Sequence, residues 1–368
     1  MSKALESLFA ACEELEASDV HVMAGRRPCF RVRGALAPNA DFRELDAAET
    51  ETLALELGRM TMPPGAEGGD AGVKAELLRR GSLDGATTSA AGVRYRFNVY
   101  RTSDTCAVAL RRLDSRFRTF DELGVPRRLE EFCGERDGLF IVTGPTGSGK
   151  STTLATMIDI INHSREGHII TIEDPIEYIH KSDKCNVNQR EVGRDAVSFN
   201  DALEESLRQG PDVILVGEVR ELETIRTALR AAETGHLVFT TLHAGDCVGA
   251  VERLVAVFPP DEQNSARRQL SLVLRGIFAQ HLLPSSDGSR RPACELFVNT
   301  MASANHIASG HTAQIYSVIE TGGANGMVTL DQSLVKLVND GAITPRVALG
   351  LSRYPSQLKQ RLGVGMTN

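Results

Sequence analysis

The chain has 368 residues, enough for two or three domains that each bury a hydrophobic core. Hydrophobic residues make up 42% of the sequence and charged residues 24%, a balance that excludes a disordered or fibrous chain. The net charge of -7 gives no electrostatic support for a nucleic-acid partner, and no apolar run reaches the roughly 18 to 20 residues that cross a bilayer.

The N-terminal residues and the cysteines favour a cytoplasmic protein. Glutamates are interspersed among the first apolar residues, which contradicts the basic and apolar regions of a signal peptide. The seven cysteines are scattered and include no Cys-x-x-Cys pair, so we expect free thiols in a reducing compartment.

Residues 1–115 predict an N-terminal α+β domain. Apolar residues at helical spacing indicate a helix over residues 5–15, and a second helix is expected over 47–57. Short apolar or alternating runs indicate strands at 20–23, 30–32, 93–100 and 107–113. Residues 58–92 are rich in Gly, Ala, Ser and Pro, which predicts a flexible surface insertion with one helical turn near 74–80.

Residues 116–122 are expected to link this domain to an α/β domain over residues 123–368. Near-continuous apolar runs alternate there with helical segments, at 139–143, 169–172, 213–216 and 237–241. Such runs are typical of a parallel sheet that helices cover on both faces. Residues 300–368 are expected to be helical, and Thr329 with Gln332 predicts a capping box there.

A phosphate-binding pattern, Gly-x-x-x-x-Gly-Lys-Ser, connects the first of these strands to a helix. Its glycines let successive backbone N–H groups converge on a phosphate, and the helix N-terminus adds partial positive charge. We expect Lys150 to reach the β- and γ-phosphates of ATP and the Ser151 hydroxyl to ligate Mg²⁺. The predicted nucleotide-binding residues are Gly144, Pro145, Thr146, Gly147, Ser148, Gly149, Lys150, Ser151 and Thr152.

Carboxylates follow two other strands of the predicted sheet, where open α/β sheets place their sites. Glu173 directly follows the run 169–172, and Glu218 lies two residues after 213–216. We expect Glu173 to orient and deprotonate the attacking water, and Glu218 to hold Mg²⁺ through a bound water. Acidic residues at strand ends are otherwise helix caps or solvated charges, but the phosphate-binding pattern upstream favours the catalytic interpretation.

One histidine and a group of arginines each have two open interpretations. His243, just after the run 237–241, either senses the γ-phosphate or is an ordinary hydrogen-bonded loop histidine. The arginines on the two strands before the α/β domain form either a solvated face or arginine fingers that reach a nucleotide from another subunit. They are Arg94, Arg96, Arg111 and Arg112.

Together these segments resemble the secretion and pilus ATPase superfamily, and within it the retraction ATPases of the PilT and PilU family. Residues 207–221 look like the signature around the Walker B strand, with Glu221 where aspartate is common. Residues 171–177 resemble the aspartate box, and residues 234–243 resemble the histidine box. Residues 18–34 are similar to the start of the family's PAS-like N-terminal domain.

The resemblance implies a RecA-like P-loop NTPase core, an N-terminal PAS-like domain and a homohexamer with Arg94, Arg96 and Arg111 at the subunit interface. It also implies a Mg²⁺-dependent ATPase motor, cytoplasmic and peripheral at the inner membrane, that drives type IV pilus retraction (twitching motility) through a platform protein. The alternatives are a secretion or DNA-uptake ATPase, an accessory retraction ATPase beside a second pilus ATPase, and a nucleotide-binding regulator. Ala304 stands where retraction ATPases usually carry an arginine, which leaves the accessory role open.

Overall fold

The computed structural model describes residues 1–62, 69–113 and 116–363. It divides into an N-terminal unit (Met1–Arg116, Glu173–Ile179 and Gln189–Ser198) and a C-terminal unit (Phe117–Ile172, His180–Asn188 and Phe199–Asn368). The two predicted domains were each continuous in the sequence. The observed division differs, because two later segments of the chain join the N-terminal unit. The C-terminal unit begins at Phe117, and helix α4 (Phe120–Leu123) occupies part of the expected linker.

The described part of the N-terminal unit contains an antiparallel sheet with the strand order β3-β2-β1-β6-β5-β4. The strands are β1 (Asp19–Met23), β2 (Cys29–Val32), β3 (Ala35–Pro38), β4 (Ser82–Thr88), β5 (Arg94–Thr102) and β6 (Thr105–Arg112). The predicted helices are present as α1 (Lys3–Glu14) and α2 (Ala47–Met60), which pack on this sheet. Phe9 of α1 stacks on Tyr95 of β5 with ring centroids 4.3 Å apart, so the apolar face of α1 helps to form the core.

Most of the predicted insertion over 58–92 has regular secondary structure, and the helical turn expected near 74–80 lies within a longer helix. Residues Gly69–Arg80 form helix α3, and β4 follows directly. Val73 and Leu77 lie one helical turn apart and are buried against α2, where Gly58 permits close approach: a Cβ there would lie 2.3 Å from Val73 Cγ1. The small residues of this segment therefore serve helix packing and strand pairing. Residues 63–68 of the predicted insertion lie outside the described residues.

In the described part of the C-terminal unit, a mixed sheet has the strand order β13-β12-β7-β11-β10-β8-β9. The strands are β7 (Gly138–Thr143), β8 (Gly167–Glu173), β9 (Cys185–Glu191), β10 (Val213–Val216), β11 (Leu237–Leu242), β12 (Leu274–Pro284) and β13 (Arg290–Val298). Strands β12, β7, β11, β10 and β8 run parallel, which confirms the four predicted apolar strands. Strand β13 turns back antiparallel to β12.

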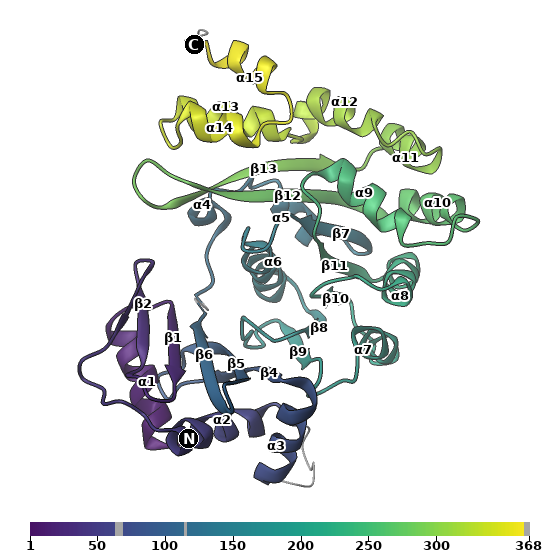
Figure 1. The fold of residues 1–368 in the computed structure, drawn as a ribbon. Coiled ribbons are helices and arrows are strands. Elements are labelled where there is room, and N and C mark those ends of the chain that lie inside the picture. Colours follow the sequence, from purple (N-terminus) through teal and green to yellow (C-terminus); the bar gives the residue numbers. More distant parts are fainter. Residues whose placement is uncertain (63–68, 114–115, 364–368) are drawn as a thin grey trace. The chain divides into compact units, whose positions relative to one another are not determined.

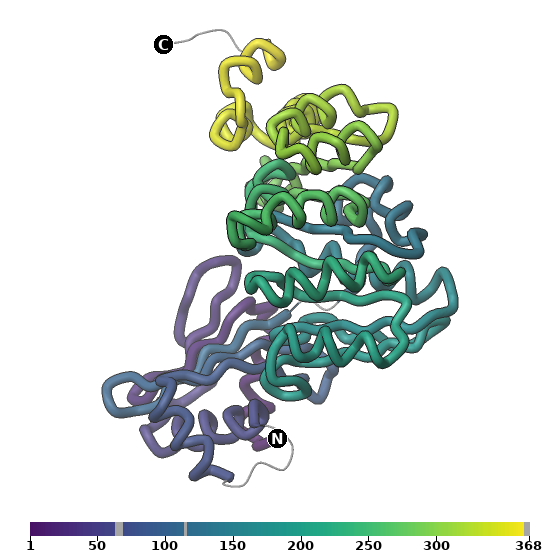
Figure 2. Tube along the Cα trace, turned by 90° about the vertical axis from the view of Figure 1, so that its right-hand side faces the viewer, coloured from purple at the N-terminus to yellow at the C-terminus, as the bar shows by residue number. Residues whose placement is uncertain are grey.

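Helices cover this sheet, and neighbouring helices pack against one another. They are α5 (Leu129–Cys133), α6 (Lys150–Ser164), α7 (Phe199–Ser206), α8 (Leu222–Glu233), α9 (Cys247–Ala256) and α10 (Gln263–Val273). Helix α8 packs between α7 and α10, and these helices lie side by side in both views (Figures 1 and 2). Helix α6 carries the apolar residues Leu154, Met157, Ile158 and Ile161 into the core beneath the sheet.

The C-terminal residues form helices, as predicted for the part of 300–368 that the structure describes. They are α11 (Met301–Ala308), α12 (Gln314–Thr321), the 3-10 turn η1 (Gly322–Asn325), α13 (Leu330–Asn339), α14 (Pro345–Leu351) and α15 (Pro355–Leu362). Within this unit they lie beyond the hairpin of β12 and β13 (Figure 1). The predicted capping box of Thr329 and Gln332 is present at the start of α13.

Among the helices of the described ranges, none has both the length and the apolar character of a membrane span. The seven cysteines all fall within these ranges and are free thiols. Burial raises the pKa of Cys133 and of Cys294 to about 12, so both are held as neutral thiols in the core.

Candidate active site

The loop between β7 and α6 has a backbone that its glycines make possible. Gly144, Gly147 and Gly149 have φ values of 144°, 76° and 92°, a region that favours glycine. At Gly144 a Cβ would also lie 2.2 Å from the backbone oxygen of Gln280, so no larger residue fits there. The glycine spacing of the sequence motif is therefore a requirement of the loop geometry itself.

The start of α6 has unsatisfied polar groups. Gly149 is its N-cap residue, and no side chain of the described residues caps the helix there. The Ser148 hydroxyl is buried and lacks a hydrogen-bond partner in the same described part of the chain. A buried hydroxyl beside an uncapped helix N-terminus suits an anionic group such as a phosphate, which would accept hydrogen bonds from both.

Lys150, the first residue of α6, supplies a positive charge at this loop. Its side chain is buried, with 9% of the residue exposed. Its amine donates hydrogen bonds to the carbonyl oxygens of Gly144, at 2.9 Å, and Pro145, at 3.0 Å. The ammonium group thus lies across the loop, where it can bind a phosphate group by a short side-chain movement.

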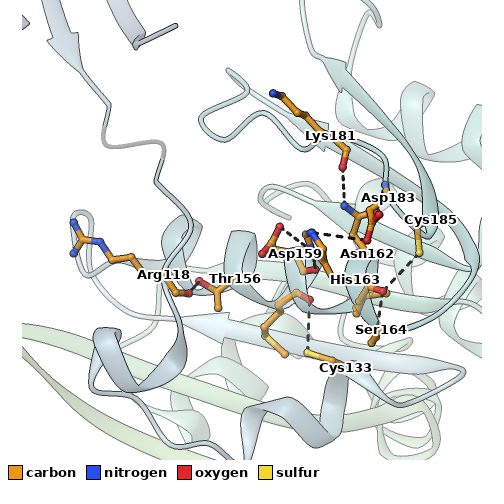
Figure 3. A network of polar contacts seen from close by, with 12 residues as sticks. Arg118, Cys133, Thr156, Asp159, Asn162, His163, Ser164, Lys181, Asp183 and Cys185 are labelled. Carbon is orange, nitrogen blue, oxygen red and sulfur yellow. Dashed lines mark hydrogen bonds and ion pairs between the residues drawn. The ribbon is translucent and has the colours of Figure 1, made fainter.

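The opposite end of α6 is fixed by polar contacts (Figure 3). The Asn162 side chain donates to the carbonyl of Lys181 at 2.7 Å and accepts from the N–H of Asp183 at 3.1 Å. Nearer the middle of the helix, the Thr156 hydroxyl donates to the carbonyl of Arg118 at 3.0 Å. These contacts anchor the helix that presents the glycine loop.

Glu218 and His243 come from neighbouring strands and meet. Glu218 lies two residues beyond the end of β10, and His243 directly follows β11. Glu218 Oε2 lies 3.5 Å from His243 Nε2 and 2.8 Å from the guanidinium of Arg220. Burial lowers the pKa of His243, the charge of Lys150 adds to this shift and Glu218 opposes it. His243 therefore lies within the electrostatic reach of both Lys150 and Glu218.

Thr143, the last residue of β7, links the glycine loop to the loop of His243. Its hydroxyl donates to the carbonyl of Ala244 at 2.9 Å, and the N–H of Ala244 donates back to the same hydroxyl at 2.9 Å. The guanidinium of Arg253 in α9 donates a hydrogen bond to the carbonyl of His243 at 2.8 Å. The His243 loop is thereby tied to the strand that precedes the glycine loop.

Glu173 is the last residue of β8 and belongs to the N-terminal unit. In that unit its carboxylate accepts a hydrogen bond from the side chain of Gln189 at 3.2 Å. The residue before it, Ile172, pairs with Val216 of β10 in the parallel register. Strands β8 and β10 therefore end at the same edge of the sheet, which agrees with the expected placement of carboxylates at carboxyl ends of strands.

The predicted arginines differ from one another. Arg94 is 8% exposed, forms an ion pair with Glu191 at 3.2 Å and donates to the carbonyl of Ile176 at 3.1 Å, all within the N-terminal unit. Burial lowers the pKa of its guanidinium, and the charge of Glu191 opposes that shift. Arg96 and Arg111 are exposed and lie opposite each other on β5 and β6, and Arg111 donates to Asp19 at 2.8 Å. Arg94 thus has a structural role in its own unit, whereas Arg96 and Arg111 are accessible.

Sequence reasoning missed Gln280, whose side chain contacts the glycine loop. It lies in β12 and is 3% exposed. Its amide accepts a hydrogen bond from the Thr153 hydroxyl at 2.7 Å and donates to the backbone carbonyl of Ser148. The signal in the sequence was a polar pair, Gln280 and His281, after the apolar run Ile277–Ala279.

Comparisons with known proteins agree along nearly the whole chain. The protein family described as Type II/IV secretion system protein matches residues 85–335. The type IV pilus retractation ATPase PilT of Pseudomonas aeruginosa is 40% identical over 95% of this chain and 98% of its own length. The type IV pilus ATPase PilU of the same organism is 38% identical over 98% of this chain and 91% of its own length.

A solved structure of a relative has a similar fold. The crystal structure of the pilus retraction motor PilT with bound ADP superposes with a TM-score of 0.86 at 42% sequence identity, covering 96% of this chain and 98% of that one. Both chains therefore share an α/β fold with mixed sheets. The chain belongs to the type II/IV secretion system protein family and, within it, to the pilus retraction ATPases of the PilT and PilU kind.

Proposed function

We propose that this ATPase powers the retraction of a type IV pilus. The observation that carries the proposal is the glycine loop with its uncapped helix and buried Ser148 hydroxyl, in a chain that matches the retraction ATPase PilT along 98% of the relative's length. The glycine loop supports the binding of ATP, and the extent of the match to PilT supports the use of ATP hydrolysis for pilus retraction.

The glycine loop and the start of α6, residues 144–152, are proposed to hold the phosphates of ATP. Backbone N–H groups at the start of α6 and the Ser148 hydroxyl donate to phosphate oxygens. Lys150 transfers its hydrogen bonds from the carbonyls of Gly144 and Pro145 to the terminal phosphates. Ser151 and, through water, Glu218 suit Mg²⁺, which when bound neutralises phosphate charge.

Glu173 is proposed to orient the attacking water and accept its proton. His243, beside Glu218 and within the electrostatic reach of Lys150, is proposed to sense the terminal phosphate. Its loop is bonded to the end of β7 through Thr143 and Ala244. Loss of the γ-phosphate near Lys150 would thus change the contacts at the carboxyl ends of both β7 and β11.

We further propose a RecA-like core with a PAS-like N-terminal domain, assembled as a cytoplasmic homohexamer at the inner membrane and acting on a platform protein. Arg96 and Arg111, which are exposed, are assigned to the nucleotide of a neighbouring subunit. Arg94 supports them from the same sheet, where its ion pair with Glu191 fixes β5 to the segment around Ile176. A secretion or DNA-uptake role, and a nucleotide-binding regulator, are the rival functions.

The test is to image pili in cells that lack the gene. We expect pili that extend but do not retract, and rescue by the wild-type gene but not by a gene carrying Lys150→Ala. Normal retraction in the deletion strain, or a defect confined to secretion or DNA uptake, would overturn the proposal.

An accessory role is the second candidate, because Ala304 of α11 stands where retraction ATPases carry an arginine. It predicts that retraction events persist in the deletion strain but stall under lower opposing force. The same imaging, with pili bound to micropillars, separates this outcome from complete loss.

A further inference from the structure

Gln280 of β12 lies against the glycine loop with both ends of its amide bonded. Gln280 Oε1 accepts from the Thr153 hydroxyl at 2.7 Å, and Gln280 Nε2 donates to the carbonyl of Ser148. The side chain is 3% exposed, so these bonds are shielded from water. One side chain therefore holds both the loop and the first turn of helix α6.

The orientation of this amide follows from its partners. A backbone carbonyl can only accept a hydrogen bond, so the NH₂ group of Gln280 must face Ser148. Its oxygen is then left for Thr153, whose hydroxyl donates. A carboxylate of the same shape would place an oxygen against the Ser148 carbonyl oxygen, and an apolar side chain would leave both partners unpaired.

This contact fixes a peptide plane that matters for anion binding. The carbonyl of Ser148 and the N–H of Gly149 belong to one planar trans peptide, so they point in opposite directions. Because Gln280 holds the carbonyl toward β12, the N–H of Gly149 points away from β12. That N–H immediately precedes the uncapped first turn of α6.

The glycines of the loop also fit around Gln280. A Cβ at Gly149 would lie 2.8 Å from Gln280 Nε2, and a Cβ at Gly144 would lie 2.2 Å from the backbone oxygen of Gln280. Two of the glycines in the motif are thus needed for the approach of β12 as well as for their positive φ values. The side chain and the loop are complementary in shape.

The strand of Gln280 pairs with β13, which contacts the starts of two helices. It pairs with Cys294 of β13, next to Glu295. The buried carboxyl group of Glu295 accepts from the N–H of Cys247 at 2.9 Å and of Leu330 at 3.3 Å, at the starts of α9 and α13. The strand that contacts the glycine loop is thus paired with the strand whose Glu295 accepts from the first residues of α9 and α13.

We propose that Gln280 is a positioning residue for nucleotide binding: it sets the Ser148–Gly149 peptide so that the Gly149 N–H can donate to a phosphate. The proposal rests on the proposed role of residues 144–152 in ATP binding. Gln280 acts through the loop and does not itself touch the phosphates. It contributes equally to ATP and to ADP, since both carry the phosphates that lie nearest the loop.

The test uses the full-length protein with the substitution Gln280→Met, which keeps the length of the side chain and removes both hydrogen bonds. We expect the Kd for ADP and the KM for ATP to rise about tenfold, the factor that corresponds to loss of one positioned hydrogen bond, with kcat within about twofold of wild type. A role in folding alone would reduce the amount of active protein, which lowers the apparent kcat and leaves KM unchanged.

Two further variants keep the proposal testable if Gln280→Met does not fold. Gln280→Glu should weaken ADP binding at least as much, because its carboxylate faces the Ser148 carbonyl. Thr153→Val should weaken it less, since it removes only one of the two bonds. If both variants are folded and bind ADP like wild type, Gln280 does not position the loop.

A matched control is Gln269→Met in α10, which breaks an exposed hydrogen bond to Glu233 and lies outside the candidate site. It should leave Kd and KM unchanged. Failure of the wild-type protein to bind ADP would refute the nucleotide site itself. Normal ADP binding by the wild type, Gln280→Met and Gln269→Met alike would refute only the role of Gln280.

Discussion

The two ends of helix α6 differ in how completely their polar groups are satisfied. At the carboxyl end, Asn162 uses its amide on both Lys181 and Asp183 (Figure 3). At the amino end, the helix has no side-chain cap and the buried Ser148 hydroxyl has no partner among the described residues. Because folding alone favours satisfied polar groups, the difference indicates that the amino end is adapted to bind a ligand and the carboxyl end to hold the helix in place.

This comparison separates binding from stability along a single element. Substitutions at the amino end should impair nucleotide binding and turnover with little effect on unfolding. Substitutions at the carboxyl end should lower the melting temperature, Tm, and leave nucleotide affinity nearly unchanged.

The largest effect is expected for Lys150→Ala at the amino end. The substitution removes the buried ammonium group that lies across the loop, so the phosphates lose their nearest cation. ATPase turnover, measured as phosphate release, should fall on the order of 10³-fold. Circular dichroism should show an intact fold, and turnover near the wild-type rate would break the assignment of the amino end.

Glu218→Gln should follow in size. The substitution keeps the shape of the side chain and removes the charge that faces His243 and Arg220. We expect turnover to fall roughly 10²-fold or more, because the proposed Mg²⁺-bound water depends on that carboxylate, while ADP binding measured by calorimetry remains. Equal loss of binding and turnover would mean that Glu218 only maintains the loop. Neutralising Glu218 should also lower the pKa of His243 further, since its charge is what opposes the shift.

Asn162→Ala tests the carboxyl end. Its two hydrogen bonds fix the segment around Lys181 and Asp183 to α6, and the side chain is 1% exposed. Their loss should cost about 1 to 3 kcal/mol of stability, seen as a Tm lower by several degrees. The Kd for ADP should stay within about twofold of wild type, because Asn162 shares no hydrogen-bond partner with the residues at the amino end of α6. A large loss of affinity would contradict the separation.

Ser148→Ala and Ser164→Ala form a matched pair on the two ends. The Ser148 hydroxyl lacks a partner in the described structure, so its removal should leave Tm unchanged or slightly higher. ADP affinity should fall about threefold to tenfold, the range of the net contribution of one hydrogen bond. Ser164 donates to the carbonyl of Ile161 at 3.2 Å, and its removal should leave affinity unchanged. Identical affinities for both variants would sink the role of the Ser148 hydroxyl.

Whether the sequence could predict a contact depended on how far apart its two residues lie along the chain. The glycine loop lies between a strand and a helix that are contiguous with it, so eight neighbouring residues were enough to predict its position and its glycines. Glu218 could be placed because it follows an apolar strand of a parallel sheet. Gln280 could not, because its partner Ser148 is 132 residues away and only the pairing of β12 with β7 brings them together.

The same reasoning explains what the sequence left undecided in the N-terminal unit. The helix at Gly69–Arg80 has only Val73 and Leu77 as its buried residues, and the small residues around it resembled an irregular loop. The ion pair of Arg94 joins residues 97 positions apart, so the strand pattern alone left Arg94 equivalent to Arg96 and Arg111. Composition and periodicity describe local structure, whereas these contacts depend on tertiary packing.

The smallest effect is expected at His163, near the carboxyl end of α6. A hydrogen bond to the carbonyl of Asp159 raises the pKa of His163, and the charges of Asp159 and Asp183 add to the shift while Lys184 opposes it. Since the folded-state pKa is raised, the stabilisation is fully present below the unfolded value of about 6.5 and is lost as the pH rises through the folded value. The Tm difference between wild type and His163→Gln should therefore be larger at pH 5.5 than at pH 8.5. It should stay below about 2 °C, because the side chain is largely exposed to solvent. ADP affinity should not change with this substitution at either pH, so a shift in Kd that tracks the titration of His163 would show that the two ends of α6 are coupled.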